Sequence, residues 1–210
     1  MKKLIIIGFG GHGKVVAEAA SLLINYNDIL FLDSNYPNCS DERVVGHSDN
    51  FKNYIQPNVE FIVAIGDCSI RLFFSNEINA CGGKLAIIVH PKAILSNKCS
   101  LGAGTFVGPL AVVNSGAKIG SSCIINTGAI VEHDCELGDG VHLSPNASIA
   151  GNVNIKNQSW IGIGATVINN ISIGESVIIG AGAVVLKSVA DSLVVVGNPA
   201  RKIKQNKNDR

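Results

Sequence analysis

The sequence lacks the features that mark several large classes of protein. It has six cysteines but no CxxC pair, and its five histidines are scattered without the Cys/His spacing of a zinc site. Its formal net charge is only +1, which is unlike a nucleic-acid-binding domain. No apolar run approaches the roughly 20 residues of a membrane span. We therefore expect no metal, no nucleic-acid partner and no membrane partner.

Signals for export and for covalent catalysis are also missing. The apolar run Leu4–Ile7 ends in a glycine-rich turn, and no small-residue cleavage site follows it. We expect a cytoplasmic protein whose cysteines are reduced thiols. No Ser or Cys lies in a nucleophile-elbow context, so a covalent acyl-enzyme is not indicated. What the chain does have is 47% hydrophobic residues and 23 glycines, which is typical of a globular protein with many tight turns.

The central feature is a period of six between residues 101 and 185. An aliphatic residue occupies every sixth position without any insertion: Leu101, Val107, Val113, Ile119, Ile125, Val131, Leu137, Leu143, Ile149, Ile155, Ile161, Val167, Ile173, Ile179 and Val185. The residue two places earlier is mostly small, as at Cys123, Ala129 and Cys135. This period fits neither a helix nor a two-faced strand, and it predicts the hexapeptide repeat of a parallel β-helix.

Three hexapeptides make one turn of 18 residues in such a coil. Residues 18 apart are then expected to stack at about 4.8 Å, the spacing of neighbouring strands. Val131 is predicted to stack with Ile149 and Leu143 with Ile161, all pointing inward. Because no residue is inserted, the coil is expected to be regular and to carry no protruding loop.

The residues before the repeat predict a different architecture. A buried strand at Lys3–Ile7 leads into Gly8-Phe9-Gly10-Gly11-His12-Gly13, a GxGxxG match, and then into a helical pattern from Lys14 to about Ile24. Further strands are expected at 29–32, 61–65 and 84–89, with a helix near 69–80. This is enough for one half of a dinucleotide-binding fold. The fold class is thus a half-Rossmann-like α/β domain (1–88), an all-β parallel β-helix (89–196) and a C-terminal tail (197–210), whose basic end from Lys204 is expected to fray.

Ligands of open parallel sheets collect at the carboxyl ends of the strands. Gly10, His12, Asp33 and Gly66 are expected to face one crevice there. We favour binding of a nucleotide moiety in this crevice. Binding of NAD or FAD is less favoured, because a full dinucleotide-binding fold needs two such halves. A purely structural role for the turn is also less favoured. Arg71 has two equally weighted roles, contacting a phosphate or bracing the loop.

Two histidines stand out among the apolar and small residues of the repeat. His133 lies between Glu132 and Asp134, two residues after the inward position Val131, so it is expected at a corner next to Gly151 of the following turn. A neutral imidazole is a base at pH 7, and an adjacent carboxylate would fix its tautomer. His142 precedes an inward residue and is expected to point outward. The alternative for His133 is a solvated surface histidine with no function.

Together these motifs resemble a known family. GxGGHG near the N-terminus, uninterrupted hexapeptides, Glu132-His133-Asp134-Cys135 and the closing Val196-Gly197-Asn198-Pro199-Ala200 are similar to the NeuD-type sugar acyltransferases. The resemblance covers nearly the whole chain. It implies a left-handed coil and an acetyl-CoA-dependent homotrimer with sites between neighbouring coils.

The resemblance also assigns roles to individual residues. His133 matches the family's general base and Asp134 the acid that raises its basicity. Cofactor contacts fall at His142, Gly151, Ile163, Gly180 and Ala181. The segments that hold the nucleotide part of the sugar donor match Gly10, Gly11, His12, Asp33, Ser34, Gly66 and Asp67, although Gly66-Asp67 departs from the Gly-Asn common there and leaves the base open. Apart from the resemblance, Lys187, Arg201, Lys202 and Lys204 lie toward the end of the coil, where they are candidates for contacts with the CoA phosphates or for a solvated basic tail.

The expected activity is N-acetylation of a nucleotide-linked 4-amino-deoxy sugar by acetyl-CoA in bacterial surface-glycan biosynthesis. Transfer is expected to be direct, with His133 as the base. The alternatives are a sialic acid O-acetyltransferase, a β-helix that binds a nucleotide sugar without catalysis, and an NAD-dependent or nucleotidyl enzyme that uses the glycine-rich turn.

Overall fold

The N-terminal domain is a twisted parallel sheet flanked by helices. The structure, a computed structural model, describes residues 2–206. Within that range the sheet has the strand order β3-β2-β1-β4-β5. Its strands are β1 (Lys2–Ile7), β2 (Tyr26–Leu32), β3 (Val44–Gly46), β4 (Val59–Val63) and β5 (Lys84–Leu85). The helices are α1 (Gly11–Ser21), the 3₁₀ helix η1 (Ser48–Tyr54) and α2 (Cys68–Ala80).

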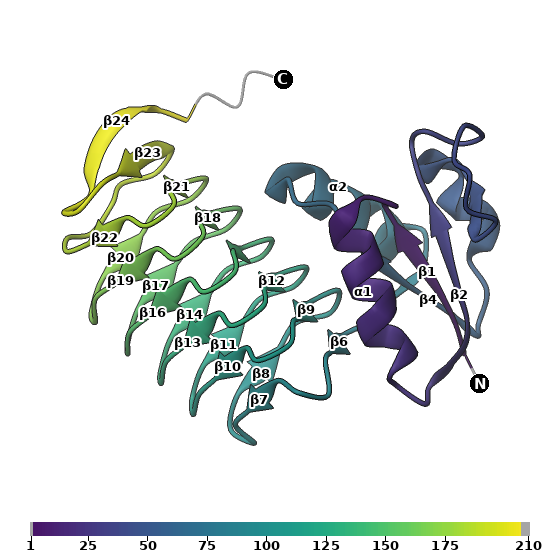
Figure 1. The fold of residues 1–210 in the computed structure, drawn as a ribbon, viewed down its shortest axis with the longest axis horizontal. Helices are drawn as coiled ribbons and strands as arrows, with labels where there is room; N and C mark the ends of the chain where they lie inside the picture. The colour runs from purple at the N-terminus through teal and green to yellow at the C-terminus, as the bar shows by residue number, and fades with distance from the viewer. Residues whose placement is uncertain (1, 207–210) are drawn as a thin grey trace.

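Both faces of this sheet are covered, which explains why β1 is a continuous aliphatic run. Leu4 and Ile6 pack with α1 on one face, and that cluster continues into Phe106 and Ile124 of the repeat region. Ile5 and Ile7 pack on the other face with Phe51 of η1 and Ile78 of α2. Helix α1 therefore lies between the sheet and the coil, as Figure 1 shows.

The repeat region winds into a coil with three parallel sheets, here called coil sheets 1, 2 and 3 in chain order. Coil sheet 1 contains β6 (Ile88–Val89), β9 (Phe106–Val107), β12 (Ile124–Ile125), β15 (His142–Leu143), β18 (Trp160–Ile161), β21 (Ile178–Ile179) and β23 (Leu193–Val196), and it ends with β24 (Arg201–Gln205). Coil sheet 2 contains β7 (Ile94–Leu95), β10 (Val112–Val113), β13 (Ile130–Val131), β16 (Ser148–Ile149), β19 (Thr166–Val167) and β22 (Val184–Val185). Coil sheet 3 contains β8 (Ser100–Leu101), β11 (Lys118–Ile119), β14 (Glu136–Leu137), β17 (Asn154–Ile155) and β20 (Ser172–Ile173).

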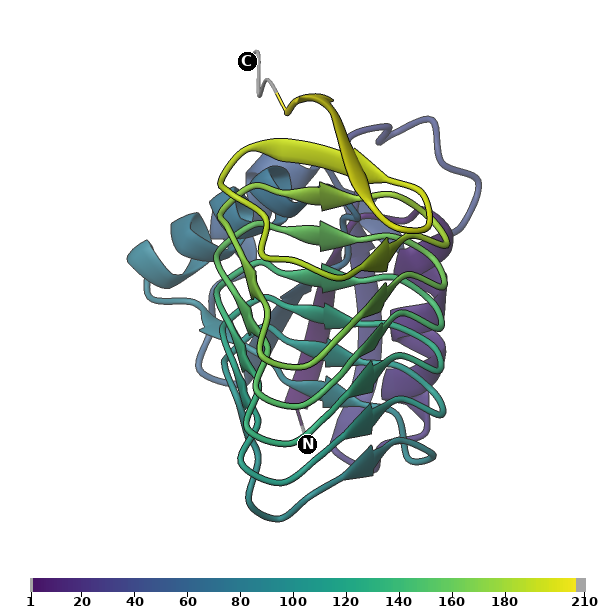
Figure 2. The ribbon, with the colours of Figure 1, turned by 90° about the vertical axis from the view of Figure 1, so that its left-hand side faces the viewer.

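The stacking that the period of six predicts is confirmed by the register of the strands. Val131 pairs with Ile149 and Leu143 with Ile161, each 18 residues apart. The inward aliphatic residues form one buried cluster with the small residues two places before them. Figure 2 shows the successive turns in register. Each fully buried aliphatic side chain stabilises the coil by roughly 1.5–3 kcal/mol. The predicted fold class, a half-Rossmann-like domain followed by a left-handed parallel β-helix, is correct.

The corners of the coil have a backbone signature of their own. A residue with positive φ recurs every sixth position, as at Gly128 (φ 65°), Asp134 (φ 58°), Gly140 (φ 69°) and Asn146 (φ 58°). Glycine, asparagine and aspartate are the residues that tolerate this conformation best. The left-handed residue thus lets the chain turn after each two-residue strand without breaking the register.

The structure adds two elements to those expected and corrects two local expectations. Strand β3 and helix η1 were not expected, because their sequence has no clear periodicity. The single strand expected at 84–89 is two strands, since β5 belongs to the N-terminal sheet and β6 to coil sheet 1. The end expected to fray from Lys204 is ordered as far as Gln205, because β24 pairs antiparallel with β23. The remainder of that end, residues 207–210, lies outside the described residues.

Between residues 2 and 206, no helix is both long and apolar enough to cross a membrane.

Candidate active site

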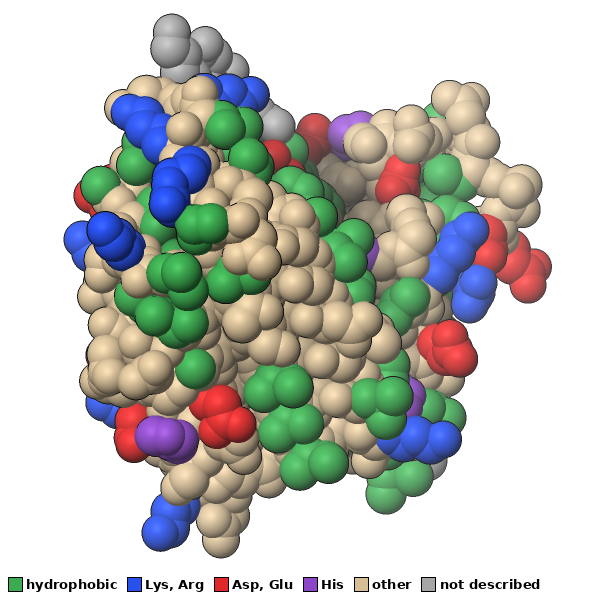
Figure 3. Space-filling model, turned by 60° about the vertical axis from the view of Figure 1, so that its left-hand side comes forward, with side chains coloured by type: hydrophobic (Ala, Val, Ile, Leu, Met, Phe, Trp, Pro, Cys, Tyr) green, Lys and Arg blue, Asp and Glu red, His purple; other side chains and the backbone are tan. Residues whose placement is uncertain are grey.

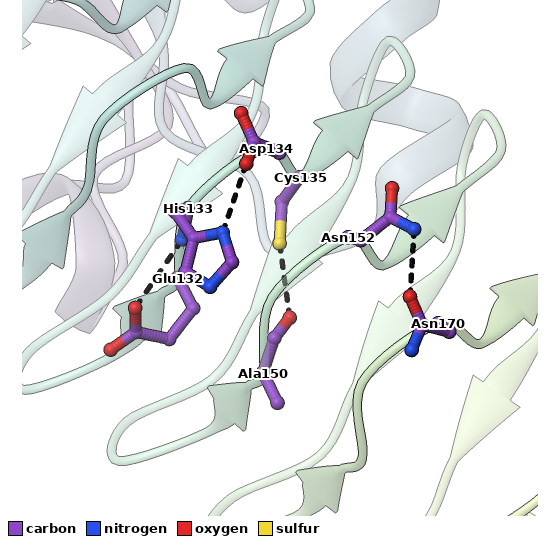
Figure 4. A network of polar contacts seen from close by, with 7 residues as sticks. All are labelled: Glu132, His133, Asp134, Cys135, Ala150, Asn152 and Asn170. Atoms are coloured by element: carbon purple, nitrogen blue, oxygen red, sulfur yellow. Dashed lines mark hydrogen bonds and ion pairs between the residues drawn. The ribbon is translucent and has the colours of Figure 1, made fainter.

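His133 lies at a corner between coil sheets 2 and 3, where the chain passes from β13 to β14. The left-handed backbone of Asp134 turns its carboxylate back toward the imidazole, and Asp134 Oδ2 lies 2.9 Å from His133 Nδ1. Glu132 contributes a carboxylate oxygen 3.3 Å from the backbone N of His133. Figure 4 shows the imidazole between these two acidic residues. The predicted cluster of Glu132, His133 and Asp134 is therefore present in the structure, and its contacts are between neighbours in the sequence.

Gly151 of the next turn lies directly against the His133 ring. A Cβ built on Gly151 would stand 2.5 Å from His133 Nε2 and 2.6 Å from its Cε1, so any other residue here would push the imidazole out of its present position. Backbone pairing fixes this contact, because Asn152 N donates to His133 O at 2.9 Å. The prediction that Gly151 adjoins His133 is thus confirmed as a matter of position.

The arrangement suits proton transfer by His133. When Nδ1–H donates to the carboxylate of Asp134, Nε2 carries the lone pair and is the basic nitrogen. The His133 side chain is 62% exposed, so a substrate has access to it from solvent. The carboxylate would also stabilise the imidazolium that forms when Nε2 takes a proton.

Apart from the His133 corner, a cavity lies at the corner between coil sheets 1 and 2, here called the His142 cavity. It has a volume of about 420 Å³ and is almost entirely apolar. Its lining consists of Asn126, His142, Ser144, Pro145, Trp160, Gly162, Ile163, Ile178, Ile179, Gly180 and Ala181. It gathers four of the five residues expected to contact the cofactor, and the fifth, Gly151, lies at the His133 corner instead.

His142 is a buried, neutral histidine. Burial above all, and then the charge of Arg71, lowers its pKa to about 3. Its ring stacks on Trp160 with the centroids 5.6 Å apart, and Nδ1 lies 3.3 Å from the carbonyl oxygen of Gly66. The indole N–H of Trp160 donates to Ser144 Oγ at 2.7 Å. His142 therefore joins the coil to the N-terminal domain as well as lining the cavity.

Another cavity, here called the glycine-loop cavity, lies at the carboxyl ends of the strands of the N-terminal sheet. Its volume is about 630 Å³, and its lining is Gly8, Gly10, Gly11, His12, Asp33, Ser34, His47, Ser48, Asp49, Ala64, Ile65, Gly66, Ile70 and Phe74. Six of the seven residues expected to bind the nucleotide part of a donor lie here. Sequence reasoning missed the contributions of η1 and of Phe74, since no motif marks them. Figure 3 shows the recess between the N-terminal domain and the coil.

Specific contacts shape the glycine-loop cavity. Asp33 accepts from the backbone N of Phe9 at 2.7 Å and from that of Asn35 at 2.9 Å, so it ties the glycine-rich turn to the end of β2. Helix α1 begins here without a side-chain cap, and its first N–H groups suit an anion. His12 packs edge-on against Phe106 of the coil, and burial, followed by the Arg71 charge, lowers its pKa to about 4.

Asp67, the seventh residue, lies just outside this lining. Its carboxylate caps α2 by accepting from Ile70 N at 2.9 Å, and it borders a neighbouring cavity together with Trp160. Asparagine is an equally good cap, so the departure from Gly-Asn preserves the helix start.

Arg71 braces the loop, and its alternative role as a phosphate contact is wrong. The side chain is completely buried, and its hydrogen bonds run to backbone carbonyls of both domains, including Gly66 O at 3.0 Å and Gly140 O at 2.6 Å.

Lys187, Arg201 and Lys202 line a cavity of about 560 Å³ at the far end of the coil. Figure 3 shows basic side chains gathered at that end. Within the described range 2–206, no group of three or more His, Cys, Asp or Glu side chains is placed to hold a metal ion.

The fold and these sites define a hexapeptide-repeat transferase with a half-Rossmann-like domain before the coil. Residues 3–78 match the PglD N-terminal domain family, and residues 116–151 match the bacterial transferase hexapeptide (six repeats) family. The acetyltransferase domain of PglB from Neisseria gonorrhoeae FA1090 has a TM-score of 0.93 and 38% identity to this chain, covering 97% of this chain and 100% of that one. The chain belongs to the NeuD-type family of sugar acyltransferases.

Two further relatives extend the comparison. PerB from Caulobacter crescentus, solved in complex with CoA and GDP-perosamine, has a TM-score of 0.91 and 34% identity, covering 97% of this chain and 98% of that one. A UDP-N-acetylbacillosamine N-acetyltransferase of Bacillus subtilis (strain 168) is 35% identical over 111 residues. That alignment spans 51% of this chain and 51% of the length of that protein, so it covers about half of each.

Proposed function

We propose that this protein transfers an acetyl group from acetyl-CoA to the amine of a nucleotide-linked 4-amino-deoxy sugar, in bacterial surface-glycan biosynthesis. The observation that carries the proposal is the His133–Asp134 pair at 2.9 Å, with the imidazole held over Gly151. The PglB acetyltransferase domain has been solved with acetyl coenzyme A, and PerB with CoA and GDP-perosamine. Their similarity to this chain supports the choice of both substrates.

The chemistry is direct transfer. His133 Nε2 removes a proton from the sugar amine as the nitrogen attacks the thioester carbonyl. When the tetrahedral intermediate collapses, the C–S bond breaks and the imidazolium returns its proton to the sulfur, which releases the CoA thiol and restores the neutral base. Asp134 holds the ring and stabilises the imidazolium. A backbone N–H near Gly151 stabilises the oxyanion, a contribution worth about 2.7–4 kcal/mol where such donors have been removed.

The acceptor is proposed to bind through its nucleotide. The glycine-loop cavity of about 630 Å³ is open at the carboxyl edge of a half-Rossmann-like sheet, where nucleotide moieties bind in such folds. Free sialic acid has no nucleotide to fill this cavity, which favours a nucleotide-linked amine over the O-acetyltransferase alternative.

We propose a homotrimer in which neighbouring chains complete each site. In one chain His133 and the His142 cavity occupy different corners, at opposite edges of coil sheet 2. The outward residues of that sheet include Ile94 (65% exposed) and Ile130 (36% exposed), whereas those of coil sheet 3 include Lys118 and Glu136. An exposed apolar face between two half-sites suits packing against another copy.

Two further parts of the proposal concern the cofactor and the compartment. The His142 cavity would take the pantetheine arm of acetyl-CoA, and Lys187, Arg201 and Lys202 would meet its phosphates. A cytoplasmic location fits the six cysteines, each of which is a free thiol.

The test replaces the base. A thiol-release assay with acetyl-CoA is run against UDP-, dTDP- and GDP-linked 4-amino sugars and sialic acid. His133→Ala is expected to lower kcat by about 10²–10⁴-fold on the preferred acceptor, because general-base assistance is lost.

The matched control is His90→Ala, which removes another imidazole of the coil, one whose Nδ1 accepts locally from Lys92 N. It is expected to retain activity. Full activity in the His133→Ala protein, at an unchanged oligomeric state, would overturn the assignment of the base.

A further inference from the structure

Arg71 is a buried cation that joins the two domains through their backbones. Nε donates to Ser122 O at 2.8 Å and Nη2 to Gly140 O at 2.6 Å, both on the coil. Nη1 donates to the carbonyls of Ile65 and Gly66 at 2.8 and 3.0 Å, in the loop that walls the glycine-loop cavity. The five N–H groups of a guanidinium form a rigid fork, so all these carbonyls are fixed relative to one another.

One of these carbonyls also touches His142. Gly66 O lies 3.3 Å from His142 Nδ1 while it accepts from Arg71 Nη1. A carbonyl oxygen has two lone pairs and only accepts, so it can serve both donors. It follows that Nδ1 of His142 must carry a hydrogen for this contact to be a hydrogen bond.

The other ring nitrogen then has a defined state. In a neutral imidazole with hydrogen on Nδ1, Nε2 is a bare acceptor. The His142 side chain is only 7% exposed, and its Nε2 makes no hydrogen bond with any residue from 2 to 206. The ring borders the apolar His142 cavity. A buried acceptor without a donor is costly. Nε2 is itself enclosed, so a ligand in this cavity satisfies it where binding brings an N–H within reach of that nitrogen.

We propose that Arg71 is a positioning residue that holds the Gly66 carbonyl against His142 and thereby keeps His142 in the Nδ1–H tautomer, with Nε2 ready to accept from a ligand amide N–H. On the proposed function, on which the identity of the ligand rests, that amide belongs to the pantetheine arm of acetyl-CoA. The Gly66 carbonyl then links the wall of the nucleotide site to the cofactor site in the same chain.

The charge of Arg71 and its geometry make separable contributions. Its positive charge disfavours the imidazolium form of His142, and His12 acts in the same direction. The fixed directions of its guanidinium N–H groups hold the Gly66 carbonyl in position against His142. Lysine keeps the charge but has three donors on a single nitrogen, and it cannot hold loop and coil carbonyls together. Arg71→Lys therefore removes the geometry alone, and Arg71→Met removes both.

The test reads the tautomer in the full chain without substrate, by two-bond ¹H–¹⁵N correlation spectra of histidine at pH 7. The His142 signals are assigned by comparison with His142→Gln. The wild-type protein is expected to show one tautomer, with hydrogen on Nδ1. Arg71→Lys and Arg71→Met are expected to show a mixture of tautomers or the Nε2–H form.

Ser75→Ala is the matched control, because the Ser75 hydroxyl is buried on the same helix and donates to the backbone carbonyl of Arg71 without touching the guanidinium. It is expected to keep the wild-type tautomer. In the thiol-release assay, Arg71→Lys is expected to raise KM for acetyl-CoA on the order of 2–10-fold, the loss of about one hydrogen bond, with a smaller change in kcat.

Two results would overturn the proposal. One is an Nε2–H tautomer of His142 in the wild-type protein, a result that does not depend on how either Arg71 variant folds. The other is a retained Nδ1–H tautomer in a folded Arg71→Lys protein. Because the spectra are recorded on the free protein, they decide the role of Arg71 even if the acetyltransferase assay fails for every sugar.

Discussion

At the scale of single residues, three histidines of one chain are prepared for different tasks by their surroundings. His133 is exposed at a coil corner and has a carboxylate on Nδ1, which suits a base. His12 and His142 lie buried near Arg71, where the imidazolium form is disfavoured, which suits neutral contacts. Residue type alone does not separate these roles, since the difference comes from solvent exposure and neighbouring charge.

The buried histidines predict how stability depends on pH. The pKa of His142 is about 3 in the folded chain and near 6.5 when unfolded. Below pH 6.5 the unfolded state therefore binds more protons, and stability falls as the pH drops from about 6.5 toward about 3. His142 alone is expected to cost about 2 kcal/mol at pH 5 relative to pH 7.5, measured by urea unfolding.

His142→Gln serves as the comparison, because glutamine does not titrate. Its loss of stability between pH 7.5 and pH 5 is expected to be smaller than that of the wild type by about the same 2 kcal/mol. Equal losses in the two proteins would show that His142 does not titrate as its burial implies.

At the scale of the element, the backbone conformation of the coil corner determines how the Asp134 carboxylate contacts the His133 imidazole. Asp134 has φ 58°, as do Asn146 and Asn152 at equivalent corners. The residue at each such corner must tolerate the left-handed conformation. At the corner beside His133 this residue also supplies the carboxylate that contacts the imidazole. Aspartate satisfies both demands, so the structural requirement and the proposed catalytic role coincide in one residue.

Asp134→Asn and Asp134→Ala separate these two requirements. Asparagine tolerates positive φ, so Asp134→Asn is expected to keep the stability of the wild type and to lower kcat. Alanine strains the corner, so Asp134→Ala is expected to lower the free energy of unfolding by about 1–2 kcal/mol as well. Thermal unfolding and the thiol-release assay measure the two effects, and equal stability of both variants would contradict the account of the corner.

At the scale of the whole molecule, the coil places the two proposed half-sites on different corners. His133 lies between coil sheets 2 and 3, and the His142 cavity lies between coil sheets 1 and 2, beside the glycine-loop cavity. A rigid coil cannot bring these corners together. A cyclic assembly can, since it places one corner of each chain beside another corner of its neighbour.

Mixed oligomers test this arrangement. Chains with His133→Ala lack the proposed base. In chains with Gly11→Trp the indole fills the glycine-loop cavity, because Gly11 has open space around it. Neither homo-oligomer is expected to be active. Oligomers refolded together from equal amounts are expected to recover about a quarter of the wild-type activity. Each shared site needs an intact His133 from one chain and an intact Gly11 from its neighbour, and in a random mixture each of these conditions is met about half the time.

The control mixes wild-type and His133→Ala chains to establish that subunits exchange, as detected by native mass spectrometry of a tagged chain. Mixed oligomers with no recovered activity would place the base and the acceptor site within one chain and would overturn the shared site.

The period of six from Leu101 to Val185 determined the coil, its register and the corner position of His133, because stacking at a fixed repeat leaves one arrangement that buries every aliphatic residue. The glycine-rich turn likewise determined the location of the glycine-loop cavity. The division at residues 88 and 89 and the roles of the site residues stay predictions. Only the tertiary structure decided the role of Arg71, the burial of His142 and the contributions of η1, since these depend on how two domains pack. Contacts between residues as distant in sequence as Arg71 and Gly140 produce no periodic pattern in the sequence. In the repeat, by contrast, the same inward position is aliphatic in every turn, so the packing can be predicted from the sequence.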